Sequence, residues 1–130
     1  MMHSRRLALP IIIAASVSAM PAFAAAQSSY VYCDNGLRCF KQPCPSNSAL
    51  DLATGKIIKG VSIDTSGLPQ QDEAIVDQSD VLYAGKVVLR GSIEPRTQTI
   101  TGKDYTLSWL VASRIVRTAK DSERKHCFSH

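Results

Sequence analysis

Two stretches in the second half of the chain, residues 83–93 and 105–116, alternate apolar and mixed side chains. A period of two places successive side chains on opposite faces of a β-strand, so each stretch predicts a long strand with one mostly apolar face. The sequence Thr-Gly-Lys-Asp at residues 101–104 is typical of a turn and directly precedes the second stretch. The second half of the chain therefore predicts a long hairpin.

The first half of the chain predicts shorter elements. Residues 29–33 are rich in residues that favour strands, and residues 48–52 and 56–64 flank an Ala-Thr-Gly turn. Residues 69–78 begin with proline, carry acids in the first turn and predict a short helix. The chain as a whole predicts a mainly β fold with one short helix and a disulfide-stapled loop. Its sheet is expected to be a small antiparallel sheet or a partly open barrel, which includes an OB-like barrel.

The alternation also predicts which side chains form the core. The apolar phases of the two long stretches contain Tyr83, Val87, Leu89, Tyr105, Leu107 and Trp109. We expect Val87, Leu89, Leu107 and Trp109 to be buried. The same phase favours a core position for the two tyrosines over an aromatic surface that stacks on sugars or single strands.

The N-terminal segment has the three parts of a secretory signal peptide. Within residues 1–24, two arginines precede an apolar run at residues 7–19, and an Ala-x-Ala cleavage motif follows. The apolar run is shorter than the roughly 20 residues that cross a bilayer. Cleavage after Ala24, or alternatively after Ala26, leaves one domain of residues 25–130 without a membrane span. We therefore expect a periplasmic or secreted protein.

The charge of the exported chain is small. The full sequence has 15 Lys and Arg against 11 Asp and Glu, and removal of the two signal-peptide arginines leaves 13 against 11, a net charge of +2. Proteins that bind nucleic acid or anionic membranes usually carry a larger basic surface. The composition therefore does not predict a nucleic-acid partner.

Four cysteines, Cys33, Cys39, Cys44 and Cys127, lie beyond the signal peptide. An even number of cysteines in an exported chain predicts two disulfides, but sequence alone leaves three pairings open. We favour Cys39–Cys44, which closes a proline-containing loop, together with Cys33–Cys127, which would tie the C-terminal segment to the first strand.

Candidate catalytic and metal-binding groups are few. The histidines of the exported chain, His126 and His130, are both in the last five residues, whereas a catalytic base must be held close to its substrate. The cysteine spacing differs from that of zinc sites, although Cys127 and the two histidines leave a metal site as the less favoured alternative. The sequence predicts no catalytic residue, no metal and no cofactor.

The segment around Cys39 and Cys44 is the best candidate for a binding loop. Its remaining candidate residues are Arg38, Phe40, Lys41, Gln42, Pro43 and Pro45. Proline on both sides of Cys44 stiffens the backbone. This stiffness suits a structural loop, and it equally suits a presented loop like those of small protease inhibitors.

The loop sequence at residues 38–46, the Thr-Gly turn within residues 51–55 and the segment at residues 89–93 resemble a motif of small exported bacterial domains of unknown function. In that motif, an Arg-Cys-x4-Cys-Pro loop precedes a short strand and a Thr-Gly turn. The resemblance implies a bacterial envelope or secreted protein. It implies no activity, because the family has none assigned.

The first functional hypothesis is a non-catalytic module that binds or structurally supports another component of the bacterial envelope, with an envelope or secreted protein as its partner. The alternative is a secreted hydrolase inhibitor whose contact is the loop at residues 39–45. A third hypothesis is a small hydrolase that uses carboxylates. The sequence assigns no oligomeric state to the chain.

Overall fold

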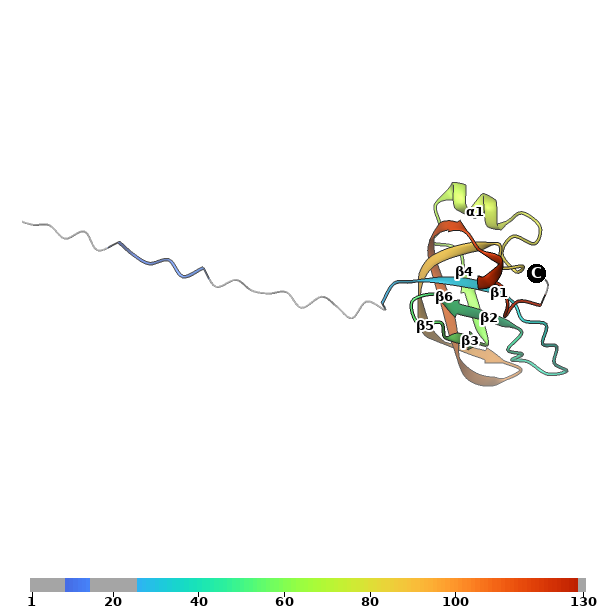
Figure 1. Ribbon diagram of the computed structural model, residues 1–130. Helices are drawn as coiled ribbons and strands as arrows, with labels where there is room; N and C mark the ends of the chain where they lie inside the picture. Colours follow the sequence, from blue (N-terminus) through green and yellow to red (C-terminus); the bar gives the residue numbers. More distant parts are fainter. Residues whose placement is uncertain (1–8, 15–25, 129–130) are drawn as a thin grey trace, which may run out of the picture.

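The computed structural model describes residues 9–14 and 26–128 (Figure 1). Residues 9–14 form no helix or strand, and the rest of the predicted signal peptide, with its Ala24 cleavage site, lies outside the described residues. No helix in the described part of the chain has the length and hydropathy of a membrane span.

Six strands and one short α-helix make up the domain. In chain order, the elements are β1 (Ser28–Asp34), β2 (Asn47–Asp51), β3 (Ile57–Lys59), β4 (Val61–Asp64), α1 (Gln70–Val76), β5 (Val87–Ile100), β6 (Lys103–Thr118) and the 3-10 turn η1 (Asp121–Glu123). The prediction of a mainly β fold with one short helix is confirmed.

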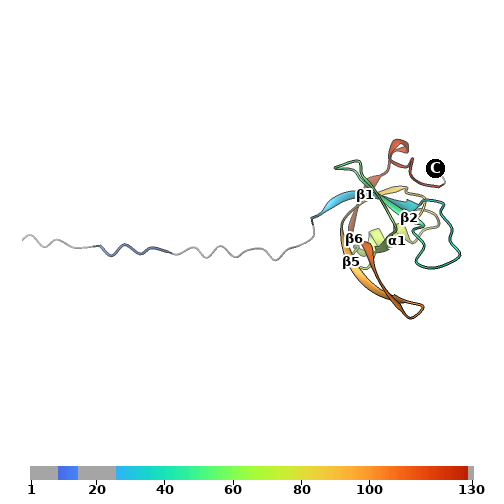
Figure 2. The ribbon, with the colours of Figure 1, turned by 90° about the horizontal axis from the view of Figure 1, so that it is seen from below.

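The six strands form one mixed sheet in the order β3-β2-β1-β5-β6-β4. All neighbouring strands are antiparallel except β4 and β6, which are parallel. The two marginal strands, β3 and β4, are separated in sequence only by Gly60, whose φ of 75° bends the chain between them. Because one residue joins its two margins, the sheet curls into a partly open barrel whose ladder is not closed between β3 and β4 (Figures 1 and 2).

The predicted long hairpin is formed by β5 and β6, which pair from Val87 and Thr118 to the tip. Thr101 and Gly102 make the turn with φ values of 52° and 75°, as a two-residue hairpin turn requires. The first long strand was predicted to begin at Tyr83, but it begins at Val87. Gly85, with φ of 69°, instead turns the chain beside the Cys33–Cys127 bridge, and Tyr83 is exposed rather than in the core.

The hydrophobic core follows only part of the predicted pattern. Leu89 and Val87 are buried as predicted, whereas Leu107, Trp109 and Tyr105 are only half-buried. The buried residues of β6 are Leu110 and Ala112, which occupy the opposite phase. Both phases of β6 carry apolar side chains, so alternation alone could not identify the core face.

Two disulfides staple the domain, with the pairing favoured from the sequence. Cys33–Cys127 ties the end of β1 to the C-terminal segment and is buried in a second apolar cluster with Val31 and Val88. Cys39–Cys44 closes the loop between β1 and β2.

Candidate binding site around the disulfide loop

Residues 35–46 connect β1 to β2 without helix or strand, yet their ends are tightly held. The Asn35 N–H donates to the Ser46 carbonyl at 2.8 Å. The Asn35 side-chain amide donates to the Pro45 carbonyl and to the Ser48 hydroxyl, each at 2.8 Å. Together with Cys39–Cys44, these bonds fix the shape of the disulfide loop against the barrel.

Arg38 stabilises the first half of the loop. Its guanidinium makes an ion pair of 2.7 Å with Asp34, whose carboxylate also accepts the Gly36 N–H at 2.8 Å. The hydrogen bonds from Arg38 and then from Gly36 lower the pKa of Asp34. Arg38, one of the predicted loop contacts, is therefore bonded to the end of β1.

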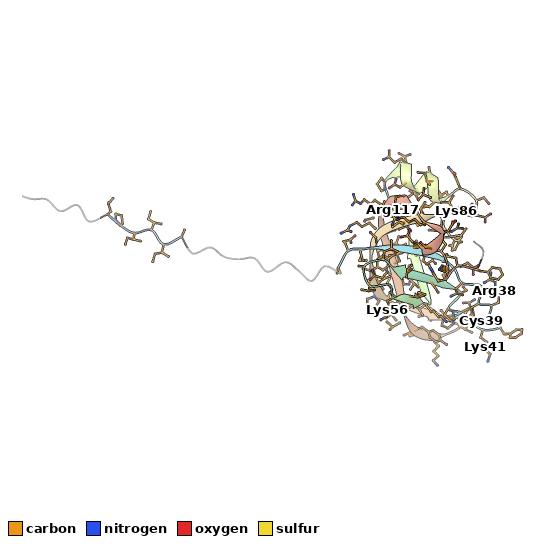
Figure 3. The ribbon with its side chains drawn as sticks, viewed as in Figure 1. Arg38, Cys39, Lys41, Lys56, Lys86 and Arg117 are labelled. Carbon is orange, nitrogen blue, oxygen red and sulfur yellow. A yellow bond between two sulfur atoms is a disulfide. The ribbon has the colours of Figure 1, made fainter. Side chains whose placement is uncertain are left out.

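The tip of the loop carries the most exposed aromatic ring of the domain. The Phe40 side chain is fully exposed, and Lys41 beside it is exposed as well. Figure 3 shows Arg38, Cys39 and Lys41 gathered at one side of the molecule, whereas Lys86 and Arg117 lie toward α1. The loop thus projects an aromatic and a basic side chain into solvent.

A groove of about 400 Å³, here called the loop–hairpin groove, separates the disulfide loop from the β5–β6 hairpin. Its lining residues are Gln42, Pro43, Cys44, Pro45, Asn47, Gly60, Val61, Ser62, Gln98, Ile100 and Leu107. Figures 1 and 2 both show the loop and the hairpin tip on the same side of the barrel. Of the predicted loop contacts, Gln42, Pro43 and Pro45 line this groove.

The lining of the loop–hairpin groove determines what it can bind. Gln42, Asn47 and Gln98 supply amide donors and acceptors, Ser62 adds a hydroxyl, and the prolines, Ile100 and Leu107 supply apolar surface. None of these lining residues carries a charged group or a histidine. Such a surface can hold a ligand by hydrogen bonds and apolar contact, whereas general acid–base chemistry needs a titratable group within reach.

The sheet face that contributes Gln98 and Leu107 continues toward Trp109. Directly opposed residues in an antiparallel ladder share a face, and the opposed pairs here are Gln98 with Tyr105, Arg96 with Leu107 and Glu94 with Trp109. The Arg96 guanidinium lies 5.0 Å from the Trp109 ring centre and makes ion pairs with Asp64 at 2.9 Å and Glu94 at 2.8 Å. This charged cluster covers Trp109 in place of a hydrophobic core.

The carboxyl group of Asp64 in this cluster is held in its charged form. Hydrogen bonds from the Ser66 hydroxyl and backbone N–H, and then from Arg96, lower its pKa to about 2. The indole Nε1 of Trp109 is buried and has no hydrogen-bond partner within residues 26–128. The cluster has the character of a rigid structural support rather than of a proton-transfer site.

A second hollow, of about 540 Å³, lies beside the loop and the sheet margin and is here called the edge hollow. Its lining residues are Asn35, Gly36, Leu37, Ser48, Ile57, Lys59 and His126. His126 donates its Nε2–H to the Val31 carbonyl at 3.0 Å, and burial lowers its pKa. The edge hollow thus combines apolar and basic groups, and none of its lining residues is acidic.

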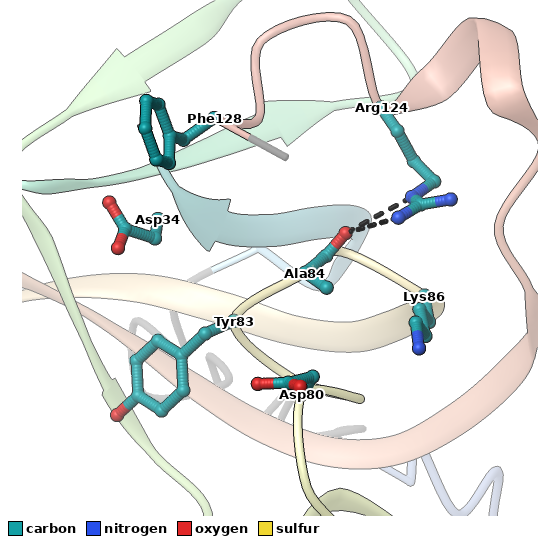
Figure 4. A pocket seen from close by; sticks show the side chains of 7 residues that line it. All are labelled: Asp34, Asp80, Tyr83, Ala84, Lys86, Arg124 and Phe128. Carbon is teal, nitrogen blue, oxygen red and sulfur yellow. Dashed lines mark hydrogen bonds between the residues drawn. The ribbon is translucent and has the colours of Figure 1, made fainter. Parts of the chain in front are cut away.

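A third hollow, of about 420 Å³, contains the carboxylates Asp34 and Asp80. Figure 4 shows Arg124 bonded to the Ala84 carbonyl, with hydrogen bonds of 3.0 and 2.9 Å, and Lys86 on the same side. A carboxylic acid that donates a proton near neutral pH needs a raised pKa, whereas that of Asp34 is lowered. This geometry does not favour the hydrolase hypothesis.

Two residues of the metal alternative from the sequence, His126 and Cys127, lie together with Cys33, but the cysteines are not available as ligands. One ligand atom each from Cys33, His126 and Cys127 lies within 4.8 Å of the others. Both cysteines are joined in a disulfide, and the thiolate is the form that binds metal. His130, the remaining member of that alternative, lies outside the described residues.

Comparison of the chain with protein-family models, with curated proteins and with solved structures found no match. The resemblance to exported bacterial domains therefore remains an expectation from the sequence. The groove residues that sequence reasoning missed are Asn47, Gly60, Val61, Ser62, Gln98, Ile100 and Leu107. The last three reach the loop only through the pairing of distant strands.

Proposed function

We propose that this protein is a non-catalytic binding module that works outside the cytoplasm and holds part of a partner in the loop–hairpin groove. The observation that carries this proposal is the lining of the groove, which offers amides, one hydroxyl and apolar surface on a rigid scaffold. Groups of this kind recognise a ligand by shape and hydrogen bonding. The Cys39–Cys44 bridge keeps one wall of the groove ordered before binding, which lowers the entropy lost on association.

The proposed location and partner rest on the sequence and on the disulfides. The signal-peptide pattern and two disulfides suit the periplasm or the medium, where disulfides persist. The resemblance to exported bacterial domains supports a bacterial envelope setting. The partner is then an envelope or secreted protein, and the small net charge supports no nucleic-acid partner.

A pair of neighbouring substitutions tests the groove. Gln98 lines the groove, whereas Thr97 is exposed and points to the opposite face of the same strand. Partners retained from periplasmic extract by the immobilised wild type would be purified and titrated by calorimetry. We expect Gln98→Arg to weaken binding at least about tenfold, equivalent to about 1.4 kcal/mol, and Thr97→Arg to leave binding unchanged. Equal affinities of the two variants would contradict the proposal.

The exposure of Phe40 favours the hydrolase inhibitor as the second candidate. A fully exposed aromatic ring at the tip of a stapled loop resembles the anchor residues that dominate tight interfaces. Proteases with a hydrophobic specificity slot accept such a ring. We expect stoichiometric inhibition of a chymotrypsin-like protease that is lost in Phe40→Ala and retained in Ile75→Ala, an exposed control on α1. Undiminished proteolysis with the wild type in molar excess argues against this candidate.

A further inference from the structure

β3 leaves one margin of the sheet open. In the ladder with β2, the Asp51 N–H donates to the Lys56 carbonyl, and the Gly60 N–H donates to the Asn47 carbonyl, both at 2.9 Å. Bonded positions alternate along an antiparallel strand. The backbone N–H and C=O groups of Ile57 and Lys59 therefore point away from β2, and they have no hydrogen-bond partner within residues 26–128.

The edge hollow lies directly beside these open backbone groups. Ile57 and Lys59, two residues apart on β3, both line it, so their side chains share one face of the strand. Leu37 lines the same hollow from the disulfide loop. Leu37 and Ile57 are 44% and 47% exposed, which leaves apolar surface uncovered next to the open margin.

Three lysines without an ion-pair partner in the described part of the chain lie around this margin. Lys59 lines the hollow. Lys56 and Lys125 are exposed and directly precede two of its lining residues, Ile57 and His126. None of these three lysines forms an ion pair with a residue in the described ranges. The acids beside the margin are already bonded: Asp51, opposite Lys56, accepts hydrogen bonds from the Ser28 hydroxyl and the Ala53 N–H, and Asp34 is paired with Arg38. The margin therefore complements a negatively charged partner.

We propose that an extended acidic segment of another protein adds to β3 as a further strand, with an apolar side chain seated in the edge hollow. Strand addition of this kind draws affinity from main-chain hydrogen bonds and specificity from a pocket beside the edge. The surface is distinct from the loop–hairpin groove, since the two hollows have no lining residue in common. A second copy of this chain is disfavoured, because pairing β3 with itself brings lysines together.

The concave shape of the edge hollow favours a protein segment over a lipid surface as the occupant. A side chain can enter a hollow of about 540 Å³, whereas a flat bilayer contacts protruding groups. The probe is an eight-residue peptide in which glutamates alternate with valines around a central phenylalanine. Its controls are the same peptide with lysine in place of glutamate and vesicles of phosphatidylglycerol and phosphatidylcholine.

Amide hydrogen exchange of the full domain measures which backbone N–H groups of β3 are hydrogen-bonded. Without peptide, the Ile58 amide should be protected by β2, whereas those of Ile57 and Lys59 should exchange fast. With the acidic peptide, we expect exchange at Ile57 and Lys59 to slow at least about tenfold. Unchanged exchange at both positions under peptide saturation overturns the proposal, as does equal binding of the lysine peptide.

Matched variants locate the contact. We expect Ile57→Ser and Lys59→Glu each to weaken acidic-peptide binding about tenfold or more. Val116→Ser, at 44% exposure on β6, and Lys86→Glu near the α1 end should leave it unchanged. Vesicle binding without peptide binding, or self-association without peptide binding, would assign the margin to a membrane or to a second copy and refute the proposal.

Discussion

His126 is a residue whose surroundings make the stability of the fold depend on pH. Burial beside β1 lowers its pKa below the ordinary 6.5, although its hydrogen bond to the Val31 carbonyl opposes the shift. The unfolded chain therefore takes up a proton at a higher pH than the folded chain does. The contribution of His126 to the free energy of unfolding is therefore fully present above pH 6.5. It is lost as the pH falls from 6.5 to the folded pKa.

Thermal melts between pH 8 and pH 5 test this prediction, with His126→Gln as the variant that cannot titrate. We expect the wild type to lose more melting temperature than the variant as the pH passes below 6.5. Comparing the two proteins cancels the contribution of every other titrating group. A wild type that gains stability relative to His126→Gln on acidification would show that the fold favours the charged imidazole.

Among the secondary-structure elements, Gly60 joins the two marginal strands and so determines how the sheet closes. It separates β3 from β4, has φ of 75°, and a Cβ placed on it would lie 3.1 Å from the Pro45 Cβ. Gly55 has nearly the same φ, 74°, but open space around its Cα. The two glycines therefore share the backbone requirement and differ in their packing against the disulfide loop.

Substitution of each glycine by alanine separates these effects. Gly55→Ala should destabilise the domain by about 1–2 kcal/mol, the usual energy of a left-handed backbone for a residue with a Cβ. Gly60→Ala should destabilise it further, because the added methyl group displaces Pro45. Urea unfolding followed by circular dichroism measures both values. If the two losses are equal, the disulfide loop accommodates the added methyl group at no cost in stability.

The elements that the sequence predicted well are those whose signals are local. Alternation and turn residues located the β5–β6 hairpin, and proline with early acids located α1. The bend at Gly60 and the parallel pairing of β4 with β6 were not predicted, because one glycine does not identify a bend and strand pairing depends on the whole barrel. The same reason explains why the burial of Trp109 was predicted wrongly. Its half-buried position depends on Arg96 and Asp64 rather than on its neighbours in sequence.

At the scale of the whole molecule, the candidate site was predictable only on the loop side. Cysteines and prolines identified one wall of the loop–hairpin groove, including Gln42, Pro43 and Pro45. The opposite wall, with Gln98 and Leu107, consists of ordinary strand residues that reach the loop only when the barrel forms. The open edge of β3 likewise becomes visible only from the register of its hydrogen bonds with β2.

The two disulfides constrain the molecule to different extents. Cys33 and Cys127 are 94 residues apart in sequence, whereas Cys39 and Cys44 are five apart. A disulfide stabilises the fold mainly by reducing the freedom of the unfolded chain, and the effect grows with the length of the closed loop. For loops of these lengths, the entropic relation gives about 4.7 and about 2 kcal/mol respectively. The long bridge also lies in the core beside Val31, Val88 and Gly85, whereas the short one lies at the surface.

Paired alanine variants test this order. Alanine avoids the buried hydroxyl that serine would leave in the core. We expect C33A/C127A to lose more unfolding free energy than C39A/C44A, by about 2–3 kcal/mol. Urea titrations of the two variants and the wild type at one pH provide the comparison. Because a domain of this size has a total stability of roughly 5–15 kcal/mol, the first variant should be partly unfolded at 37 °C and the second folded with a looser loop. Equal losses in the two variants would mean that the barrel holds the C-terminal segment in place without the Cys33–Cys127 bridge.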